Sequence, residues 1–223
     1  MINIKYFIHN GFYVPFLLAL FTYNDFLLFF FSCLKLLSAN HYFCFQQYND
    51  NSKYYNWKHM VRLTDTGHIA NFIYYFYPDF LPVAFNIHFI IAFGYWSTRL
   101  CFNLNDSDSI PEHFKIMINK PFSEFIRIAN HSFSLLYYTY ILCNCDTCYN
   151  YFNYYSLLYV YCWCHCWLFF IYFPWRFITH DPIYSILSND SPVYISLLIF
   201  VYMHFVAYFS NYIGYYITNY ITN

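Results

Sequence analysis

Long apolar stretches alternate with shorter polar segments along the chain. A helix that crosses a membrane needs about 20 predominantly apolar residues, and six stretches come near that length. They cover residues 12–37, 64–77, 80–102, 122–142, 154–178 and 194–218, and the first is interrupted by the polar pair Asn24 and Asp25. Pro78 follows the second stretch and predicts a tight helical hairpin, because proline disfavours helix in the residue before it. The pattern predicts an all-α integral membrane bundle of about six transmembrane helices in a single domain, 1–223.

Composition supports lipid as the surrounding solvent. Hydrophobic residues make up 60% of the chain and charged residues 9%, against roughly 45–50% and about 25% in soluble proteins. So few charges cannot cover a water-facing surface. The net charge is −1 and no run of basic residues occurs, so nucleic acid is excluded as a partner.

The basic residues indicate an orientation. Lys5 precedes the first stretch, which is too long for a cleaved signal and predicts a retained helix. Eight basic residues flank alternate loops: Lys35, Lys53, Lys58, Arg62, Arg99, Lys115, Lys120 and Arg176. Because positive loops face the cytoplasm, we expect both termini on the lumenal or outer side. The expected location is an endomembrane, such as the endoplasmic reticulum, or the plasma membrane.

The second stretch opens with polar residues at helical spacing. Thr64, His68 and Asn71 stand at i, i+4 and i+7, on one helix face. A functional interpretation places the Thr64 hydroxyl within reach of an imidazole. The structural alternative is that Thr64 or Thr66 caps the helix, with an acidic residue favoured beside it by the helix dipole.

The fourth stretch carries ionisable residues at the same kind of spacing. Glu124, Arg127 and His131 lie at i, i+3 and i+7, with Asn130 beside them. Ionisable groups at membrane depth are costly and mark functional sites. His131 can act as a general base, as a proton relay or as a hydrogen-bond partner between helices.

Other histidines and the cysteines suggest packing. Asn86, His88, His165 and His204 fall in apolar helices, where interhelical hydrogen bonds are their default role. Two groups, Cys143-x-Cys-x-x-Cys148 and Cys162-x-Cys-His-Cys166, invite a zinc interpretation. In a helix Cys164 points away from Cys162 and Cys166, so the second group does not form one site. The sequence predicts no metal site and no cofactor.

A resemblance to a known family follows from the order of several features. These are Trp57, Leu63-Thr64, Tyr95-Trp96, a polar loop, and Asn130-His131. In this order the chain resembles, over residues 57–218, the androgen-induced family of multi-pass membrane proteins. Some members hydrolyse fatty acid esters of hydroxy fatty acids. The resemblance implies a membrane-embedded hydrolase with a threonine nucleophile, a histidine base and a fatty acid ester as substrate.

The family pattern is carried over residue by residue. Thr64 corresponds to the threonine nucleophile. Animal members read Asn-His-x-x-His, with the second histidine catalytic. If Asn130-His131 is aligned to the first pair, Ser134 stands at the catalytic position; a shift of three residues puts His131 there. Asn130 or His68 would then donate to the developing oxyanion.

A second function class remains open at this stage. The alternative is a non-enzymatic multi-pass membrane protein, either a scaffold or a small transporter. In a transporter Glu124, Arg127 and His131 would form a polar path.

Overall fold

The computed structural model describes residues 13–40, 62–102, 120–145, 148, 150–180 and 193–221. These residues form helices joined by short connections, and no strand occurs among them. The all-α class predicted from the sequence is therefore confirmed for this part of the chain. Trp57 and the polar connections 46–61 and 103–119 lie outside it.

The first apolar stretch is two helices, so the prediction of one helix over 12–37 is wrong. α2 covers Tyr13–Thr22 and α3 covers Asp25–Asn40. Tyr23 between them has a φ of 51°, in the left-handed region that ends a helix. Asn24 then caps α3, because its Oδ1 accepts the backbone N–H of Leu27 at 3.2 Å. Tertiary contacts hold the turn, since Tyr23 stacks on Tyr140.

A helical hairpin follows, with a short link at proline. α5 covers Leu63–Phe76, the 3₁₀ turn η2 covers Pro78–Phe80, and α6 covers Leu81–Phe102. Proline at the first position of η2 lacks an N–H, which would be unsatisfied there in any case. The short link makes α5 and α6 antiparallel neighbours.

α8 covers Lys120–Cys143 and is connected to α9, Tyr154–Cys166, by a loop that contains the disulfide Cys145–Cys148. Asn153 starts α9 with a capping box, in which its side chain accepts the N–H groups of Tyr155 and Ser156. The loop also contacts the α5–α6 link through Tyr151, whose hydroxyl donates to Asp79 Oδ1 at 3.4 Å. Burial and the charge of Asp79 raise the pKa of Tyr151.

Two long outer helices complete the chain. α9 continues through a π-helical stretch, η4 (Trp167–Tyr172), into α10 (Phe173–Thr179), and ends at His180 with a left-handed φ of 56°. α11 covers Val193–Tyr216 and continues into a second π-helical stretch, η6 (Ile217–Ile221). Within the described ranges, three helical stretches are long and apolar enough to cross a membrane: Pro78–Leu100, Tyr154–Thr179 and Leu197–Tyr220.

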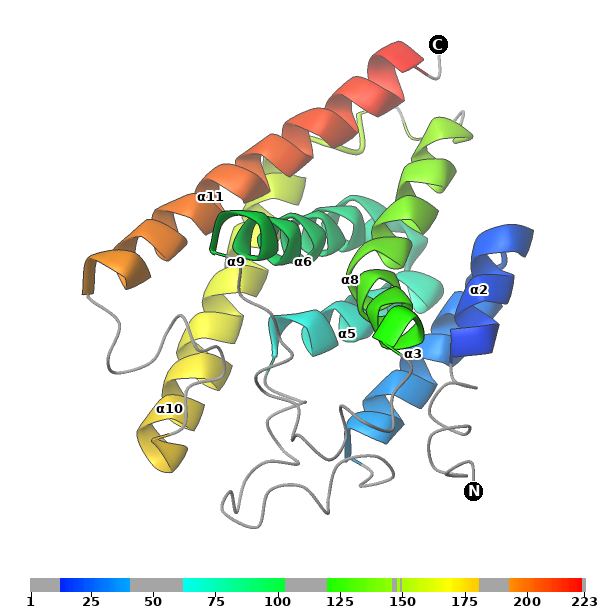
Figure 1. Cartoon of the computed structure of the whole chain (residues 1–223). Helices are drawn as coiled ribbons and strands as arrows, with labels where there is room; N and C mark the ends of the chain where they lie inside the picture. The colour runs from blue at the N-terminus through cyan, green and yellow to red at the C-terminus, as the bar shows by residue number, and fades with distance from the viewer. Residues whose placement is uncertain are drawn as a thin grey trace, which may run out of the picture.

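α6 is the central helix of the bundle. It packs against α5, α8, α9 and α11. In Figure 1, α2 and α3 lie on one side of it and α9, α10 and α11 on the other. The largest fully buried side chains come from α3, α6 and α8, among them Phe31, Phe85, Tyr137 and Tyr138. The core therefore surrounds the central helix, and the polar residues predicted as candidates in α5 and α8 flank it.

Candidate functional site

A buried polar cluster joins α6 to three other helices. It consists of Ser32 on α3, Asn71 on α5, His88 on α6 and Tyr138 on α8. His88 Nε2 lies 2.6 Å from Asn71 Oδ1 and 3.1 Å from the carbonyl oxygen of Gly67. Because both partners are carbonyl oxygens, we assign the proton to Nε2. Asn71 Oδ1 also accepts the Tyr138 hydroxyl at 2.7 Å, and its Nδ2 donates to Ser32 Oγ at 3.0 Å.

Every polar atom of the Asn71 amide is engaged in this cluster, and Asn71 itself is fully buried. Buried polar groups are costly unless they are hydrogen-bonded. The cluster therefore fixes how α3, α5, α6 and α8 sit against one another. The sequence singled out Asn71 and His88, but Tyr138 carried no signal among 29 tyrosines.

A second group of hydrogen bonds lies at the start of α3. Asp25 Oδ1 accepts the hydroxyls of Tyr137, at 2.5 Å, and Tyr74, at 3.3 Å. The rings of Tyr74 and Tyr137 both pack edge-on against Tyr138. Asp25 was treated in the sequence only as an interruption of an apolar stretch; here it ties α3 to α5 and α8.

His131 lies in an aromatic setting about two turns before Tyr138 on α8. Its ring stacks on Tyr95 of α6, with centroids 3.9 Å apart and planes at 11°. The Tyr95 hydroxyl accepts from Arg99 Nη1 at 2.7 Å. The next residues of both helices are also joined, because Trp96 Nε1 donates to Ser132 Oγ at 3.0 Å. Two segments that are 36 residues apart in sequence thus meet at this end of α6.

These contacts fix the directions of the helices. Tyr95 meets His131 and His88 stacks on Tyr138, so α6 and α8 are antiparallel. α5 is also antiparallel to α6, because a short link joins them. α5 and α8 therefore run in the same direction, and the Asn71–Tyr138 hydrogen bond sets their register.

The two predicted catalytic residues stand at equal spacing from that hydrogen bond. Thr64 precedes Asn71 by seven residues (71 − 64 = 7), and His131 precedes Tyr138 by seven (138 − 131 = 7). Seven residues are about two helical turns and roughly 10 Å of rise. Thr64 and His131 are both half-buried, at the same level of the bundle and on the helix faces that carry Asn71 and Tyr138. No hydrogen bond joins them among the described residues.

The remaining candidates are placed as follows. His68 is buried on α5, with its ring edge-on to Phe31 of α3 at 5.4 Å. Ser134 is buried on α8. The side chains of Asn130, Glu124 and Arg127 lie outside the described residues, so the polar path of the transporter interpretation has no described counterpart.

The capping alternative for Thr64 or Thr66 is wrong. α5 begins after Arg62, and no side chain caps it. Thr64 therefore lies within the first turn. The Thr66 hydroxyl donates to the carbonyl oxygen of Leu63 at 2.7 Å instead. Asp65 is in the first turn, where the helix dipole favours a negative charge.

Two further results concern the cysteines and metals. The described residues contain no group of three or more His, Cys, Asp or Glu side chains that could hold a metal ion. The disulfide Cys145–Cys148 was not predicted from the sequence. The signal was its C-x-x-C spacing, which had been considered only as a zinc motif.

Comparisons of this chain with models of protein families, with curated proteins and with solved structures find no match.

Proposed function

We propose that this chain is a multi-pass integral membrane protein whose apolar segments lie in an endomembrane or the plasma membrane. Three helical stretches have the necessary length and apolar character. Large apolar side chains are widely exposed on α9 to α11, for example Phe170 at 77% and Phe177 at 82%. Such a surface would aggregate in water and is satisfied by lipid.

The disulfide supports the orientation with basic loops in the cytoplasm. Cys145–Cys148 follows the C-terminal end of α8, whereas the basic residues Arg62, Arg99 and Lys120 stand at the opposite ends of α5, α6 and α8. Disulfides persist in the endoplasmic reticulum lumen and outside the cell and are rare in the cytosol. An oxidised pair in this loop therefore agrees with a lumenal or outer location for it.

Within the membrane we propose hydrolysis of a fatty acid ester, with Thr64 as nucleophile and His131 as base. The observation that carries the proposal is the equal spacing of Thr64 and His131 from the Asn71–Tyr138 hydrogen bond. The resemblance to the androgen-induced family adds support, because two of its separate features, Tyr95-Trp96 and His131, are in contact. The bundle would hold the hydroxyl and the imidazole at one depth.

The reaction needs these two groups in defined roles. A threonine hydroxyl is a weak nucleophile unless a base removes its proton. His131 would accept the proton from Thr64 Oγ1 while the oxygen attacks the ester carbonyl, and would then return it to the departing alcohol. A second cycle with water would release the acid. Stacking on Tyr95 restricts the plane of the His131 ring, which is the positioning that general-base catalysis requires.

The test is labelling of the purified protein in nanodiscs by a fluorophosphonate probe, together with hydrolysis of a fatty acid ester. Thr64→Ala should abolish both. His131→Ala should lower the rate by about 10²- to 10⁴-fold, the usual contribution of a general base. The matched control is Thr66→Ala, because the Thr66 hydroxyl is bonded within its own helix; it should retain labelling. Labelling that persists in Thr64→Ala would remove the assignment.

The alignment that places Ser134 at the catalytic position can be tested in the same assay. Ser134→His restores the animal spacing. Two results together would move the role of base from His131 to position 134. Ser134→His would gain hydrolysis, and His131→Ala would abolish hydrolysis in the parent chain but not in the Ser134→His variant.

A further inference from the structure

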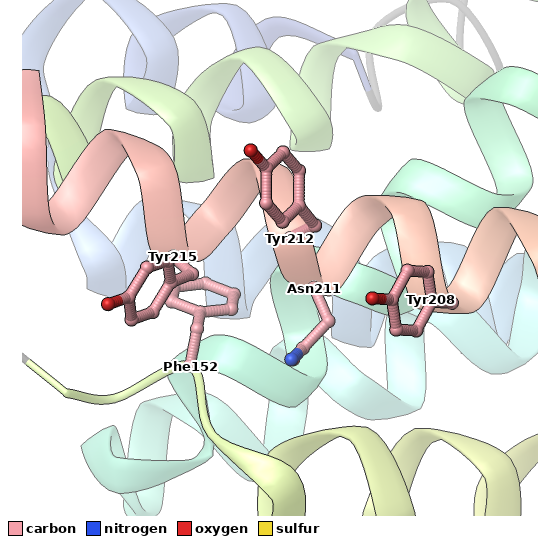
Figure 2. Close-up of a pocket in the computed structure, with 5 residues that line it drawn as sticks. All are labelled: Phe152, Tyr208, Asn211, Tyr212 and Tyr215. Carbon is pink, nitrogen blue, oxygen red and sulfur yellow. The ribbon is translucent and has the colours of Figure 1, made fainter.

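A small open pocket lies on α11, away from the candidate site. It has a volume of about 190 Å³ and is lined by Phe152, Tyr208, Asn211, Tyr212 and Tyr215. Figure 2 shows Asn211 between Tyr208 on one side and Phe152 with Tyr215 on the other, while Tyr212 projects from the same helix. Four of the five lining residues are aromatic, and none carries a charge.

The wall formed by Phe152 is fixed in place. Phe152 is buried and packs edge-on against Phe85 of α6, with centroids 5.5 Å apart. It also rests directly on Gly214, where an added Cβ would lie 2.2 Å from its ring. Glycine is therefore required at this position for the close approach. The pocket is preformed, which lowers the cost of binding.

Asn211 gives the pocket one oriented polar group. Its Oδ1 accepts hydrogen bonds from Asn86 Nδ2 at 3.0 Å and Ser156 Oγ at 2.8 Å. Its Nδ2 donates one hydrogen to the carbonyl oxygen of Asn153 at 3.4 Å. Among the described residues the second hydrogen of Nδ2 has no acceptor, so it can serve a ligand oxygen.

The pocket lies at the level where α9 begins. Ser156 and Asn153, which Asn211 contacts, form the capped first turn of α9. Exposed tyrosines gather at this level. On α9 they are Tyr154, Tyr155 and Tyr159, and on α11 and η6 they are Tyr208, Tyr212, Tyr215, Tyr216 and Tyr220. Further back along α11 the exposed side chains are mainly leucine, valine and phenylalanine. Tyrosine is enriched at the membrane–water interface, which favours a position near the lipid head groups for this level of the bundle.

We propose that this pocket binds the quaternary ammonium head group of a phosphatidylcholine-type lipid. Aromatic ring faces attract such a cation, and aromatic side chains are the usual recognition elements for quaternary ammonium groups. The rings of Tyr208, Tyr212, Tyr215 and Phe152 line the open space that the trimethylammonium group would occupy. The Asn211 N–H donates to an oxygen of the adjoining phosphate. The site is independent of the proposed hydrolase.

The experiment uses the full-length protein in phosphatidylglycerol nanodiscs that contain a trace of photoreactive phosphatidylcholine, with the reactive group near its glycerol. Mass spectrometry maps the labelled residues. Labelling should fall within residues 208–215 and compete with unlabelled phosphatidylcholine. Phosphatidylethanolamine should compete about three- to tenfold less well, because a primary ammonium keeps its hydration and interacts less with the rings.

Three variants separate the aromatic contribution from nonspecific lipid binding. Tyr208→Leu or Tyr215→Leu should reduce labelling about three- to tenfold, while Tyr208→Phe should retain it, since the ring face remains. Tyr194→Leu is the matched control, because Tyr194 is exposed on the same helix outside the pocket; its labelling should equal the parent.

Three outcomes would overturn the proposal. Equal competition by phosphatidylethanolamine and phosphatidylcholine, or equal labelling of the Leu and Phe variants, would mean that only annular acyl chains are bound. Displacement by soluble phosphocholine at the concentration at which the lipid displaces the probe would make the ligand a free head group rather than a membrane lipid.

Discussion

The central helix α6 and the outer pair α9 and α11 have nearly the same hydropathy but opposite surroundings. Their apolar stretches have mean hydropathies of 1.4, 1.5 and 1.4. In the stretch around α6, 61% of the apolar window is buried within the bundle, whereas in each of the two outer stretches the buried share is 22%. Hydropathy therefore identifies a helix that tolerates lipid, but it does not tell a central helix from an outer one.

Their polar residues differ in the same way. On α6, Asn86 bonds to Asn211 of α11 and His88 to Asn71 of α5. On the outer helices, His165 and His204 each bond through Nδ1 to a carbonyl oxygen one turn earlier in their own helix, at Tyr161 and Phe200. The histidine of the central helix thus joins neighbouring helices, whereas the two histidines of the outer helices bond within their own helix.

The largest test of the difference removes an aromatic ring from each region. Phe85 on α6 is 1% exposed and Phe170 on the outer face is 77% exposed. Phe85→Ala should lower the free energy of unfolding by about 3–5 kcal/mol, because it leaves a cavity. Phe170→Ala should change it by less than about 0.5 kcal/mol. Steric trapping in bicelles measures both; equal losses would contradict the division into inner and outer helices.

The next test removes the centre of the polar cluster. Asn71→Leu should cost about 2–3 kcal/mol, because His88 Nε2–H and the Tyr138 hydroxyl lose a buried acceptor. Asn144→Leu is the control, since Asn144 is exposed directly after α8 and, among the described residues, its amide bonds to the carbonyl oxygen of Tyr140. If the Asn71→Leu variant unfolds with the same free energy as the parent, the cluster contributes little net stability.

A smaller effect comes from two glycines that share a hairpin. An added Cβ at Gly67 would lie 2.6 Å from Ile91 Cδ1 and 2.9 Å from His88 Cε1, and His88 is held by hydrogen bonds. Gly67→Ala should destabilise by about 1–2 kcal/mol through overpacking. Gly94→Ala, with no atom within 4 Å, should stabilise by up to about 1 kcal/mol. Thermal denaturation in detergent should show shifts of opposite sign.

The smallest expected effect concerns the periphery. Asn153→Ala removes the cap of α9 and should cost about 1 kcal/mol. Hydrogen exchange should show faster exchange in the first turn of α9 alone. A protection change that spreads to α5 and α8 would mean that the outer helices are coupled to the centre more tightly than their burial suggests.

The sequence predicts where most helices begin, because each helix starts where an apolar run starts. α5, α9 and α11 start within one residue of the predicted positions 64, 154 and 194. The break at Tyr23 was visible only as a polar interruption, because a positive φ depends on the contacts that hold it. The π-helical stretch η4 had no marker in the sequence.

The candidate site was partly accessible to sequence reasoning. Helical spacing placed Thr64, His68 and Asn71 on one face. The partner of Asn71 could not be deduced, because any of many tyrosines has the same chemistry and only helix packing selects Tyr138. The common level of Thr64 and His131 depends on the register of α5 against α8, which only the fold gives. Their catalytic pairing stays a prediction.

The turn between α2 and α3 has a consequence for the membrane topology of the chain. The two helices pack side by side, with α2 folded back along α3. A segment that turns back on itself enters and leaves through one leaflet, so it adds an even number to the count of crossings. Under the proposed orientation Tyr13 and Asn40 would both face the compartment of the basic loops, which would reverse the expectation of a lumenal N-terminus. A glycosylation acceptor placed before Tyr13 should then stay unmodified, while one placed after Ile221 should be modified.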